Sequence, residues 1–145
     1  VDLSEDLLNE ARAYLTSRGI GNAKFQQGDV YSLDESLGFF DFIYTRFLFQ
    51  HLADPKKALS KILPRLSPGG RLCVVDIDDA WLTLHPEPAG FHRFTKQAAE
   101  GQARNGGDRN VGRKLRTVPD LKKLLTSSSQ SESKSGIHAV GGAAS

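Results

Sequence analysis

Residues 40–75 read FDFIYTRFLFQHLADPKKALSKILPRLSPGGRLCVV, and this stretch constrains the fold more than any other. Phe40–Tyr44 predicts a strand, because all but one of its residues are apolar. Asp54-Pro55 predicts the start of a helix, with a capping carboxylate followed by proline at the first helical position. Leu72–Val75 is a continuous apolar run, which is typical of a parallel strand covered on both faces. Strand, helix and strand in this order predict an α/β sheet with a right-handed crossover.

The segments on either side continue the alternation. Ser4 predicts the cap of a helix that closes at Arg18-Gly19, and Ala23–Gln27 predicts a short strand after it. The short Val1–Leu3 segment is interpreted as the end of a further strand. Pro64 is expected to kink or shorten the end of the helix that begins at Pro55, because proline lacks the backbone donor.

Beyond the Ser67–Gly70 turn and the strand that follows it, the pattern becomes helical. It predicts a helix over Phe91–Arg104, a break at Gly106-Gly107 and a last short helix over Pro119–Leu125. Six of the ten residues 126–135 are serine, so this part of the chain has too little apolar surface to offset the entropy of ordering. We therefore expect one domain over residues 1–125 and a disordered Ser/Gly-rich tail over residues 126–145.

Composition places the chain in a broad class. With 39% hydrophobic and 25% charged residues among 145, it has the balance of a globular domain, and no apolar run approaches the length of a membrane span. We therefore expect no membrane partner. The single cysteine, Cys73, excludes an internal disulfide and favours the cytoplasm. Because the chain has no methionine and opens with Val1 inside a structural element, we interpret it as a fragment or a processed product.

Charge is distributed unevenly along the chain. Residues 1–54 carry four basic and nine acidic side chains, whereas residues 93–123 carry nine basic and three acidic ones. The basic stretch contains Phe94 as its one aromatic residue and matches no nucleic-acid motif, so base stacking is poorly supported. A solvated helical face or a rim that attracts anionic small molecules is the favoured interpretation, and a nucleic-acid partner is disfavoured.

Ligands of open α/β sheets bind beyond the carboxyl ends of the strands. This rule selects four positions, namely Asp2, Asp29, Thr45-Arg46, and the segment from Asp76 to Asp79. At the first position, a carboxylate between a strand and a helix can accept both hydroxyls of a ribose. At the second, Asp29 can accept from an exocyclic amine while the Val30 N–H donates to a ring nitrogen, so the two positions together suit an adenosine.

Several segments carry a resemblance to a known family. They are Val1-Asp2-Leu3-Ser4, Gln27-Gly28-Asp29-Val30, Phe40-Asp41-Phe42-Ile43-Tyr44, Gln50-His51-Leu52 before Asp54-Pro55, and Leu66-Ser67-Pro68-Gly69-Gly70-Arg71-Leu72. In order and spacing they resemble the class I S-adenosylmethionine-dependent methyltransferases. The resemblance implies a Rossmann-like, mostly parallel sheet with flanking helices, and S-adenosyl-L-methionine as the cofactor. It implies cofactor-binding residues at these positions: Asp2 and Leu3 at the ribose, Gly28, Asp29 and Val30 at the adenine, and Thr45 and Arg46 at the methionine side.

The chain departs from the family at both ends. The family's first strand and glycine-rich loop are expected upstream of Val1, and its final antiparallel strand pair is replaced by the serine-rich tail. The fold is therefore interpreted as incomplete, truncated before the end of the second strand. We expect these residues alone to bind the cofactor weakly and to have little activity.

The implied reaction is methyl transfer to a small-molecule acceptor. Candidates on the substrate side are Asp76, Asp78, Trp81 and Phe91, because the region from Asp76 to Arg113 resembles a substrate-side insertion of bacterial members, together with His51 from the Gln50-His51-Leu52 segment. No catalytic residue is singled out: a histidine such as His51 can be a general base but is more often structural. No metal site is expected, since His85, His92 and the nearby aspartates lack a standard ligand spacing.

Simpler interpretations stay open for individual residues. Asp2 can be a cap, Asp29 a turn residue and Arg46 a surface ion-pair partner, while Trp81 and Phe91 can pack a loop instead of walling a pocket. For the whole chain, the alternative is a non-catalytic adenosine-binding or interaction domain derived from the same fold. A nicotinamide-dependent oxidoreductase shares the ribose argument but does not account for the Gly28-Asp29-Val30 segment. The sequence predicts no oligomeric state.

Overall fold

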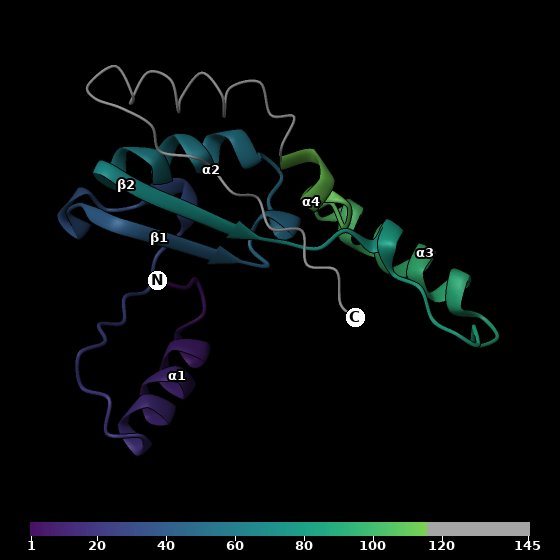
Figure 1. Ribbon diagram of the computed structural model, residues 1–145, viewed down its shortest axis with the longest axis horizontal. Coiled ribbons are helices and arrows are strands. Elements are labelled where there is room, and N and C mark those ends of the chain that lie inside the picture. The colour runs from purple at the N-terminus through teal and green to yellow at the C-terminus, as the bar shows by residue number, and fades with distance from the viewer. Residues whose placement is uncertain (116–145) are drawn as a thin grey trace. The chain divides into compact units, whose positions relative to one another are not determined.

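The computed structural model describes residues 1–115, and the predicted helix at Pro119–Leu125 and the tail lie outside them. The chain divides into two compact units, Val1–Gly38 and Phe39–Ser145, and each is described by itself. Elements are labelled as in Figure 1, where α denotes helices and β strands; short 3₁₀ turns are labelled η.

The first unit contains helix α1, Glu5–Ser17. Ser4 caps it as the sequence predicts, because its hydroxyl accepts a hydrogen bond from the backbone N–H of Leu7 at 3.3 Å. The helix ends through Gly19, whose φ of 69° lies in the left-handed region that glycine adopts without strain. Leu8 is the buried residue of α1, whereas its neighbour Leu7 is exposed.

The predicted strand at Ala23–Gln27 is wrong as a continuous strand. Its last residue, Gln27, forms a single parallel bridge with Asp2, and no longer ladder is present in the described residues. The physical reason is that the chain reaches Ser4, the cap of α1, two residues after Asp2, so pairing cannot continue in that direction. Two 3₁₀ turns follow, η1 at Val30–Ser32 and η2 at Glu35–Leu37.

The second unit is built on a parallel pair of strands, β1 at Phe40–Arg46 and β2 at Leu66–Val75. From Phe42 opposite Arg71 to Arg46 opposite Val75 the register is regular. The pairing confirms the predicted parallel α/β arrangement, and Figure 1 shows the two arrows side by side with α2 above them.

An irregularity interrupts the start of β2. Leu66 pairs with Phe40 and Arg71 with Phe42, so the intervening Ser67–Gly70 segment bulges out of the ladder. Gly69 has a φ of 76°, and a Cβ on Gly70 would lie 2.9 Å from the Ser67 carbonyl oxygen. The predicted turn is therefore present, but it lies inside the strand rather than before it.

Helix α2, Pro55–Ile62, connects the two strands. Asp54 caps it by accepting from the Lys57 N–H at 3.0 Å. The α-helix stops at Ile62 and continues as the 3₁₀ turn η4, Leu63–Arg65, which contains Pro64. The predicted shortening of this helix by proline is thus confirmed.

The core of the second unit lies where α2 and the turn after β1 meet. Its fully or nearly fully buried residues are Phe49, Leu52, Ala58, Leu59, Ile62 and Val111. The other face of β1 carries Phe40, Phe42 and Tyr44, which alternate along the strand and are 41%, 59% and 53% exposed. The expectation of strands covered on both faces therefore does not hold among the described residues.

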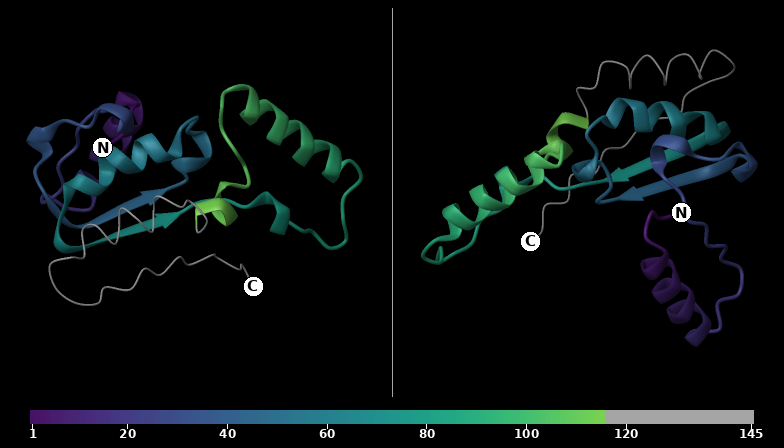
Figure 2. Two further views of the ribbon diagram at one scale, coloured as in Figure 1. Left: turned by 90° about the horizontal axis from the view of Figure 1, so that it is seen from above. Right: turned by 180° about the vertical axis from the view of Figure 1, so that it is seen from behind.

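The remainder of the second unit is helical. It comprises the turns η3 at Phe49–His51 and η5 at Asp79–Trp81, helix α3 at Phe91–Arg104 and the short helix α4 at Val111–Lys114. Helix α3 has the predicted bounds, and Figure 2 shows it as a long helix followed by α4. No helix in residues 1–115 combines the length and apolar character needed to cross a membrane.

Candidate functional site

Asp2 is held against the segment that ends at Gly28. Its backbone N–H donates to the Gln26 carbonyl oxygen at 3.3 Å, and its carbonyl oxygen accepts from the Gly28 N–H at 2.9 Å. The carboxylate is exposed, and one of its oxygens, Oδ1, accepts from the Ser4 N–H at 2.8 Å. The structure thus brings Asp2 and Gly28 together, as expected if both lie at the carboxyl ends of neighbouring parallel segments.

Gly28, Asp29 and Val30 form the turn that faces this bridge. A Cβ on Gly28 would lie 3.1 Å from a methyl carbon of Val1, so the close approach leaves little room for a larger residue. Asp29 caps η1, with Oδ1 accepting from the Tyr31 N–H at 2.8 Å, and Val30 is the first residue of that turn. Asp29 is therefore a turn residue, which is the simpler interpretation that the sequence left open. This role uses one of its two carboxylate oxygens.

Leu3 contributes its backbone to the same arrangement. Its carbonyl oxygen accepts from the Gln27 side-chain amide at 3.0 Å, while its side chain is exposed. The first unit thus gathers five of the predicted cofactor-binding residues, Asp2, Leu3, Gly28, Asp29 and Val30, around one backbone bridge.

Thr45 and Arg46 belong to the second unit and lie within β1, not after it. They pair with Val74 and Val75, because the ladder continues two residues beyond the predicted end of the strand. The Thr45 hydroxyl oxygen is buried and has no hydrogen-bond partner within residues 1–115. The Arg46 guanidinium lies 4.7 Å from the centre of the Phe47 ring, a cation–π contact.

Asp76 follows β2 and supports the turn after β1. Its Oδ2 accepts from the backbone N–H groups of Phe49 at 2.7 Å and Gln50 at 3.3 Å, and its Oδ1 accepts from the Ile77 N–H at 2.9 Å. Both carboxylate oxygens are therefore engaged by the backbone. This gives Asp76 a structural role, while its predicted role on the substrate side stays a prediction.

The next two carboxylates, Asp78 and Asp79, bind two arginines from the segment around α4. Arg113 Nε lies 2.9 and 2.8 Å from the two oxygens of Asp78, and Arg109 donates to both oxygens of Asp79. The Asp79 N–H also donates to the Arg109 carbonyl oxygen at 3.0 Å. These pairs fasten residues 109–113 to the carboxyl end of β2.

The hydrogen bond from Arg113, helped by the attraction of its charge, lowers the pKa of Asp78 below the ordinary value of 3.8, against the opposing effect of burial. Since the folded state holds this carboxyl more strongly in its charged form, the contribution to stability is present above the pKa of the unfolded chain. It is lost as pH falls through the lowered folded-state pKa.

When the pH is lowered from about 6 to about 3, we expect the free energy of unfolding to fall less in the Asp78→Asn variant than in the natural chain. The reason is that an amide does not take up the proton. Urea unfolding at the two pH values measures this. The matched control is Glu100→Gln, which removes a carboxylate from an exposed pair with Lys96 at 3.9 Å. An Asp78→Asn variant with the natural chain's full acid sensitivity contradicts the assignment.

Glycines allow the segment after α3 to approach the rest of the unit closely. A Cβ on Gly107 would lie 2.4 Å from the Gln50 carbonyl oxygen, and one on Gly112 would lie 2.8 Å from the Ile77 carbonyl oxygen. The same Ile77 oxygen accepts from the Gly112 N–H at 2.9 Å. The predicted break at Gly106-Gly107 is confirmed, and Gly106 has a φ of 80°.

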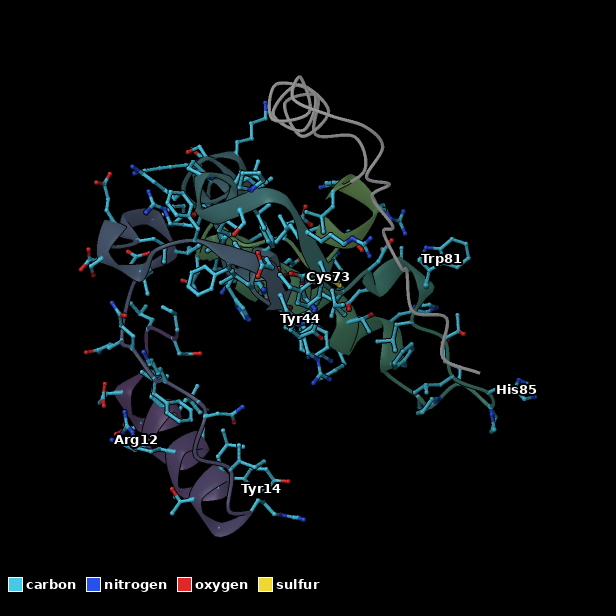
Figure 3. The ribbon with its side chains drawn as sticks, turned by 60° about the vertical axis from the view of Figure 1, so that its left-hand side comes forward. Arg12, Tyr14, Tyr44, Cys73, Trp81 and His85 are labelled. Carbon is cyan, nitrogen blue, oxygen red and sulfur yellow. The ribbon has the colours of Figure 1, made fainter. Side chains whose placement is uncertain are left out.

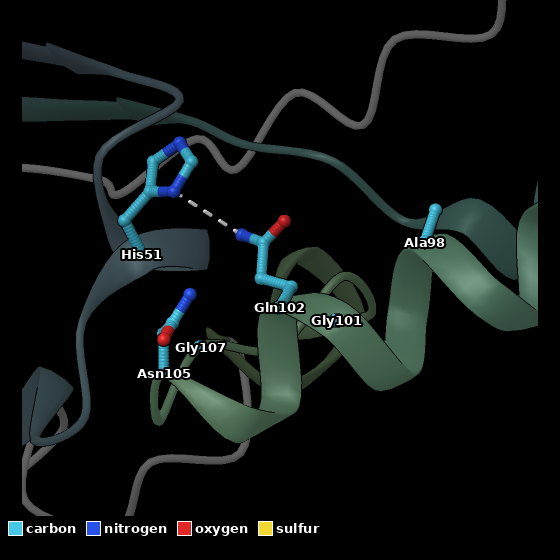
Figure 4. Close-up of a pocket in the computed structure, with 6 residues that line it drawn as sticks. All are labelled: His51, Ala98, Gly101, Gln102, Asn105 and Gly107. Atoms are coloured by element: carbon cyan, nitrogen blue, oxygen red, sulfur yellow. Dashed lines mark hydrogen bonds between the residues drawn. The ribbon is translucent and has the colours of Figure 1, made fainter.

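His51 lies at the edge of a hollow of about 280 Å³ (Figure 4). The hollow is lined by His51, Ala98, Gly101, Gln102, Asn105 and Gly107. The Gln102 amide nitrogen points toward the imidazole and lies 3.3 Å from its Nδ1. This contact links the histidine to α3.

The other substrate-side candidates are not gathered around this hollow. Trp81 is 80% exposed and extends away from the ribbon, as Figure 3 shows, and Phe91 begins α3 with its ring centre 6.2 Å from that of His92. Neither residue lines the hollow beside His51. Their assignment to a substrate pocket therefore stays a prediction.

Gln102 and Arg109 are the polar residues that the sequence reasoning missed. Gln102 donates to the Gln50 carbonyl oxygen at 2.6 Å and accepts from Arg109 Nη1 at 3.3 Å. No sequence signal distinguishes Gln102 from other polar residues on a helix face. A polar role for Arg109 could have been predicted, because Arg109 lies between Gly107 and Gly112 and the chain also carries a run of aspartates at 76–79.

Comparison with known proteins identifies the kind of domain. The family described as methyltransferase domain matches residues 1–134, which is most of the chain. The chain belongs to the class I S-adenosylmethionine-dependent methyltransferase family. The match extends past residue 125, where the composition predicts the domain boundary.

Relatives of this methyltransferase domain include two proteins with methyltransferase names. The ubiquinone/menaquinone biosynthesis C-methyltransferase UbiE of Marinomonas sp. (strain MWYL1) is 30% identical over 127 residues, which are 85% of this chain and 51% of the relative. The uncharacterized methyltransferase YcgJ of Bacillus subtilis (strain 168) is 32% identical over 76 residues, covering 52% of this chain and 30% of the relative.

A third relative has a less specific name. The uncharacterized 37.1 kDa protein in transposon TN4556 of Streptomyces fradiae is 29% identical over 116 residues, covering 79% of this chain and 32% of the relative. The chain therefore spans between about a third and a half of the length of these curated relatives.

Proposed function

We propose that the protein containing this chain transfers a methyl group from S-adenosylmethionine to a small-molecule acceptor in the cytoplasm, and that Asp2 holds the ribose of the cofactor. The single observation that carries the reaction class is the family match over residues 1–134. The geometry around the Asp2–Gln27 bridge supports the assignment of the ribose.

Asp2 has the features that a ribose ligand needs. Its backbone is fixed by hydrogen bonds to Gln26 and Gly28, so the carboxylate starts from a defined position. The Ser4 N–H uses Oδ1, and the exposed carboxylate retains acceptor capacity for hydroxyl groups. Charge-assisted hydrogen bonds of this kind are stronger than neutral ones.

The chemistry of the remaining donor set also fits a nucleoside cofactor. The carboxylate of Asp29 has acceptor capacity beyond its bond to the Tyr31 N–H and suits an exocyclic amine. In the second unit, considered by itself, the buried hydroxyl of Thr45 has no hydrogen-bond partner within residues 1–115, and a buried polar atom of this kind is costly to leave unsatisfied.

When bound, the cofactor would supply a methyl group on a sulfonium sulfur, whose carbon–sulfur bond breaks as a nucleophilic atom of the acceptor attacks in line. The chain's task in such a displacement is to position the reactants, and correct positioning alone can account for a large part of the rate. Asp2 and Asp29 would fix the nucleoside end, which leaves the substrate-side candidates to orient the acceptor.

We expect Asp2→Ala to weaken cofactor binding by about 1.5–3 kcal/mol, which is about 10- to 150-fold in Kd, in the protein that contains this chain. The loss follows from removal of hydrogen bonds to a charged group. Isothermal titration calorimetry with S-adenosylhomocysteine measures it.

Two further variants separate binding from folding. Asp2→Asn keeps a side-chain oxygen for the Ser4 N–H but loses the charge, so it should retain the local turn and still bind more weakly. Asp6→Asn removes an exposed carboxylate from the first turn of α1 and should bind as the natural protein does. Equal affinities for all three variants and the natural protein would show that Asp2 is not the ribose ligand.

The competing hypothesis is a non-catalytic adenosine-binding domain. It shares the binding prediction but not the transfer of the methyl group. Incubation with methyl-labelled S-adenosylmethionine and a panel of small aromatic and carboxylic acceptors distinguishes the two, because only the enzyme moves the label to an acceptor. The names of the UbiE relatives motivate the aromatic members of that panel.

A further inference from the structure

The amide of Gln102 has a defined orientation. Its nitrogen lies 2.6 Å from the Gln50 carbonyl oxygen, which only accepts hydrogen bonds, and its oxygen lies 3.3 Å from Arg109 Nη1, which only donates. Rotating the amide by 180° would oppose oxygen to oxygen and nitrogen to nitrogen. The two neighbours therefore fix which end of the amide faces His51.

Arg109 is itself held in place. It donates through Nε and Nη2 to the two oxygens of Asp79, and the Nη2–Oδ1 distance is 3.3 Å. Its side chain is about one-quarter exposed and that of Asp79 about one-sixth, so the pair is partly shielded from water. A chain of polar contacts thus runs from Asp79 through Arg109 and Gln102 to the imidazole.

The orientation of Gln102 determines the role of the nearest histidine nitrogen. One proton of the amide N–H₂ group is directed to the Gln50 carbonyl oxygen, and His51 Nδ1 at 3.3 Å and Gln50 Oε1 at 3.5 Å lie near the same nitrogen. Because an amide nitrogen donates and does not accept, Nδ1 can bond to it only as the acceptor. In a neutral imidazole one nitrogen accepts and the other carries the proton. Nδ1 is therefore the acceptor, and the proton belongs on Nε2.

We propose that Gln102 is a positioning residue that holds neutral His51 with its proton on Nε2, so that His51 donates a hydrogen bond to an oxygen of the methyl acceptor. The substrate part of this inference rests on the proposed function. Nε2 lies on the ring edge remote from Gln102, and the ring is exposed at the rim of the hollow (Figure 4).

This assignment separates two roles for His51. A neutral ring with its proton on Nε2 offers a donor there, whereas a general base acting through Nε2 needs a free lone pair on that atom. The chemistry selects acceptors that carry a carbonyl, carboxylate or phenolate oxygen near the atom to be methylated. It gives His51 a part in binding and orienting the acceptor rather than in removing its proton.

Long-range ¹H–¹⁵N correlation NMR of the ¹⁵N-histidine-labelled full chain tests the proposal directly, recorded without cofactor at about pH 8, where an ordinary imidazole is neutral. We expect His51 to show an unprotonated Nδ1 and a protonated Nε2. His85 is exposed and lies outside this contact chain, so it serves as the internal reference for a ring that exchanges between tautomers.

Two variants test whether Gln102 is the cause. Gln102→Glu places a carboxylate, which only accepts, against Nδ1 and should move proton population to Nδ1. Gln102→Ala removes the partner and should make His51 resemble His85, and it provides the test if the glutamate variant fails to fold. A His51 that resembles His85 in the natural chain, or that is unchanged by both substitutions, overturns the proposal.

The outcome is independent of whether the cofactor binds. If S-adenosylhomocysteine fails to bind the protein while His51 holds its proton on Nε2, the proposed function fails and the positioning by Gln102 stands. If the cofactor binds while His51 exchanges like His85, the positioning fails and the proposed function stands.

Discussion

Replacing Phe49 with alanine is expected to lower the free energy of unfolding of the second unit by about 3–5 kcal/mol, the range for truncating a buried phenylalanine. Phe49 has no exposed surface and begins the η3 turn, whose first backbone N–H is bound to Asp76. The substitution removes a ring from the meeting point of α2 and this turn, and the rigid backbone around it limits collapse of the cavity. Urea denaturation followed by far-ultraviolet circular dichroism measures the loss.

Phe94→Ala is the matched control for this prediction. The same ring is removed from α3, where Phe94 is 68% exposed, so the stability should change by no more than about 0.5 kcal/mol. Similar losses for the two variants would mean that Phe49 does not occupy the core of this unit.

Gly107→Ala is expected to destabilise the second unit by about 3 kcal/mol, at the upper end of the usual cost of overpacking. The added Cβ would lie 2.4 Å from the Gln50 carbonyl oxygen, a backbone atom that cannot rotate away. That oxygen also accepts from the Asp108 N–H at 2.8 Å and from the Gln102 amide, so displacing it breaks several contacts. Chemical denaturation and proteolysis between α3 and α4 both report this loss.

Gly101→Ala makes the same chemical change at a position where it should increase the stability of the second unit. Gly101 lies inside α3, and a Cβ there meets nothing within 4 Å. Alanine favours the helix over glycine by about 0.5–1 kcal/mol, so this variant should be slightly more stable than the natural chain. A Gly107→Ala variant as stable as the natural chain contradicts the close packing of this segment on Gln50.

Local signals predicted those parts of the fold that depend on local chemistry. The caps at Ser4 and Asp54, the shortening of α2 at Pro64 and the end of α3 before Gly106-Gly107 follow from residues within one turn of the feature they control. These interactions involve only residues close in sequence, so they form without distant partners. The structure therefore confirms the features that were predicted from them.

Features that depend on partners distant in sequence were harder to predict. The Ala23–Gln27 segment has strand character but finds Asp2 alone as a bridge partner, and β1 extends through Arg46 because Val74 and Val75 continue opposite it. The Ser67–Gly70 turn lies inside β2 because the pairing with β1 already begins at Leu66, before the turn, and continues at Arg71, after it. Strand limits are set by the partner, which a local pattern does not contain.

The candidate site divides in the same way. Asp2, Asp29 and Asp76 could be selected because each follows a predicted strand. Their position did not show that backbone N–H groups donate to one or both oxygens of each carboxylate. The role of Gln102 could not be predicted from the sequence, since it depends on contacts with residues about fifty positions earlier in the chain. The comparisons with known proteins then show the family on independent grounds.

The central claim is that the Asp2 and Gly28–Val30 segments of this methyltransferase domain bind the nucleoside of the cofactor. Hydrogen–deuterium exchange of the protein that contains this chain, with and without saturating S-adenosylhomocysteine, tests it most directly. The predicted result is slower exchange in the peptides that cover residues 1–4 and 28–32, with unchanged exchange in α2, Pro55–Ile62. Cofactor binding that leaves both of the first two peptides unchanged would contradict the claim.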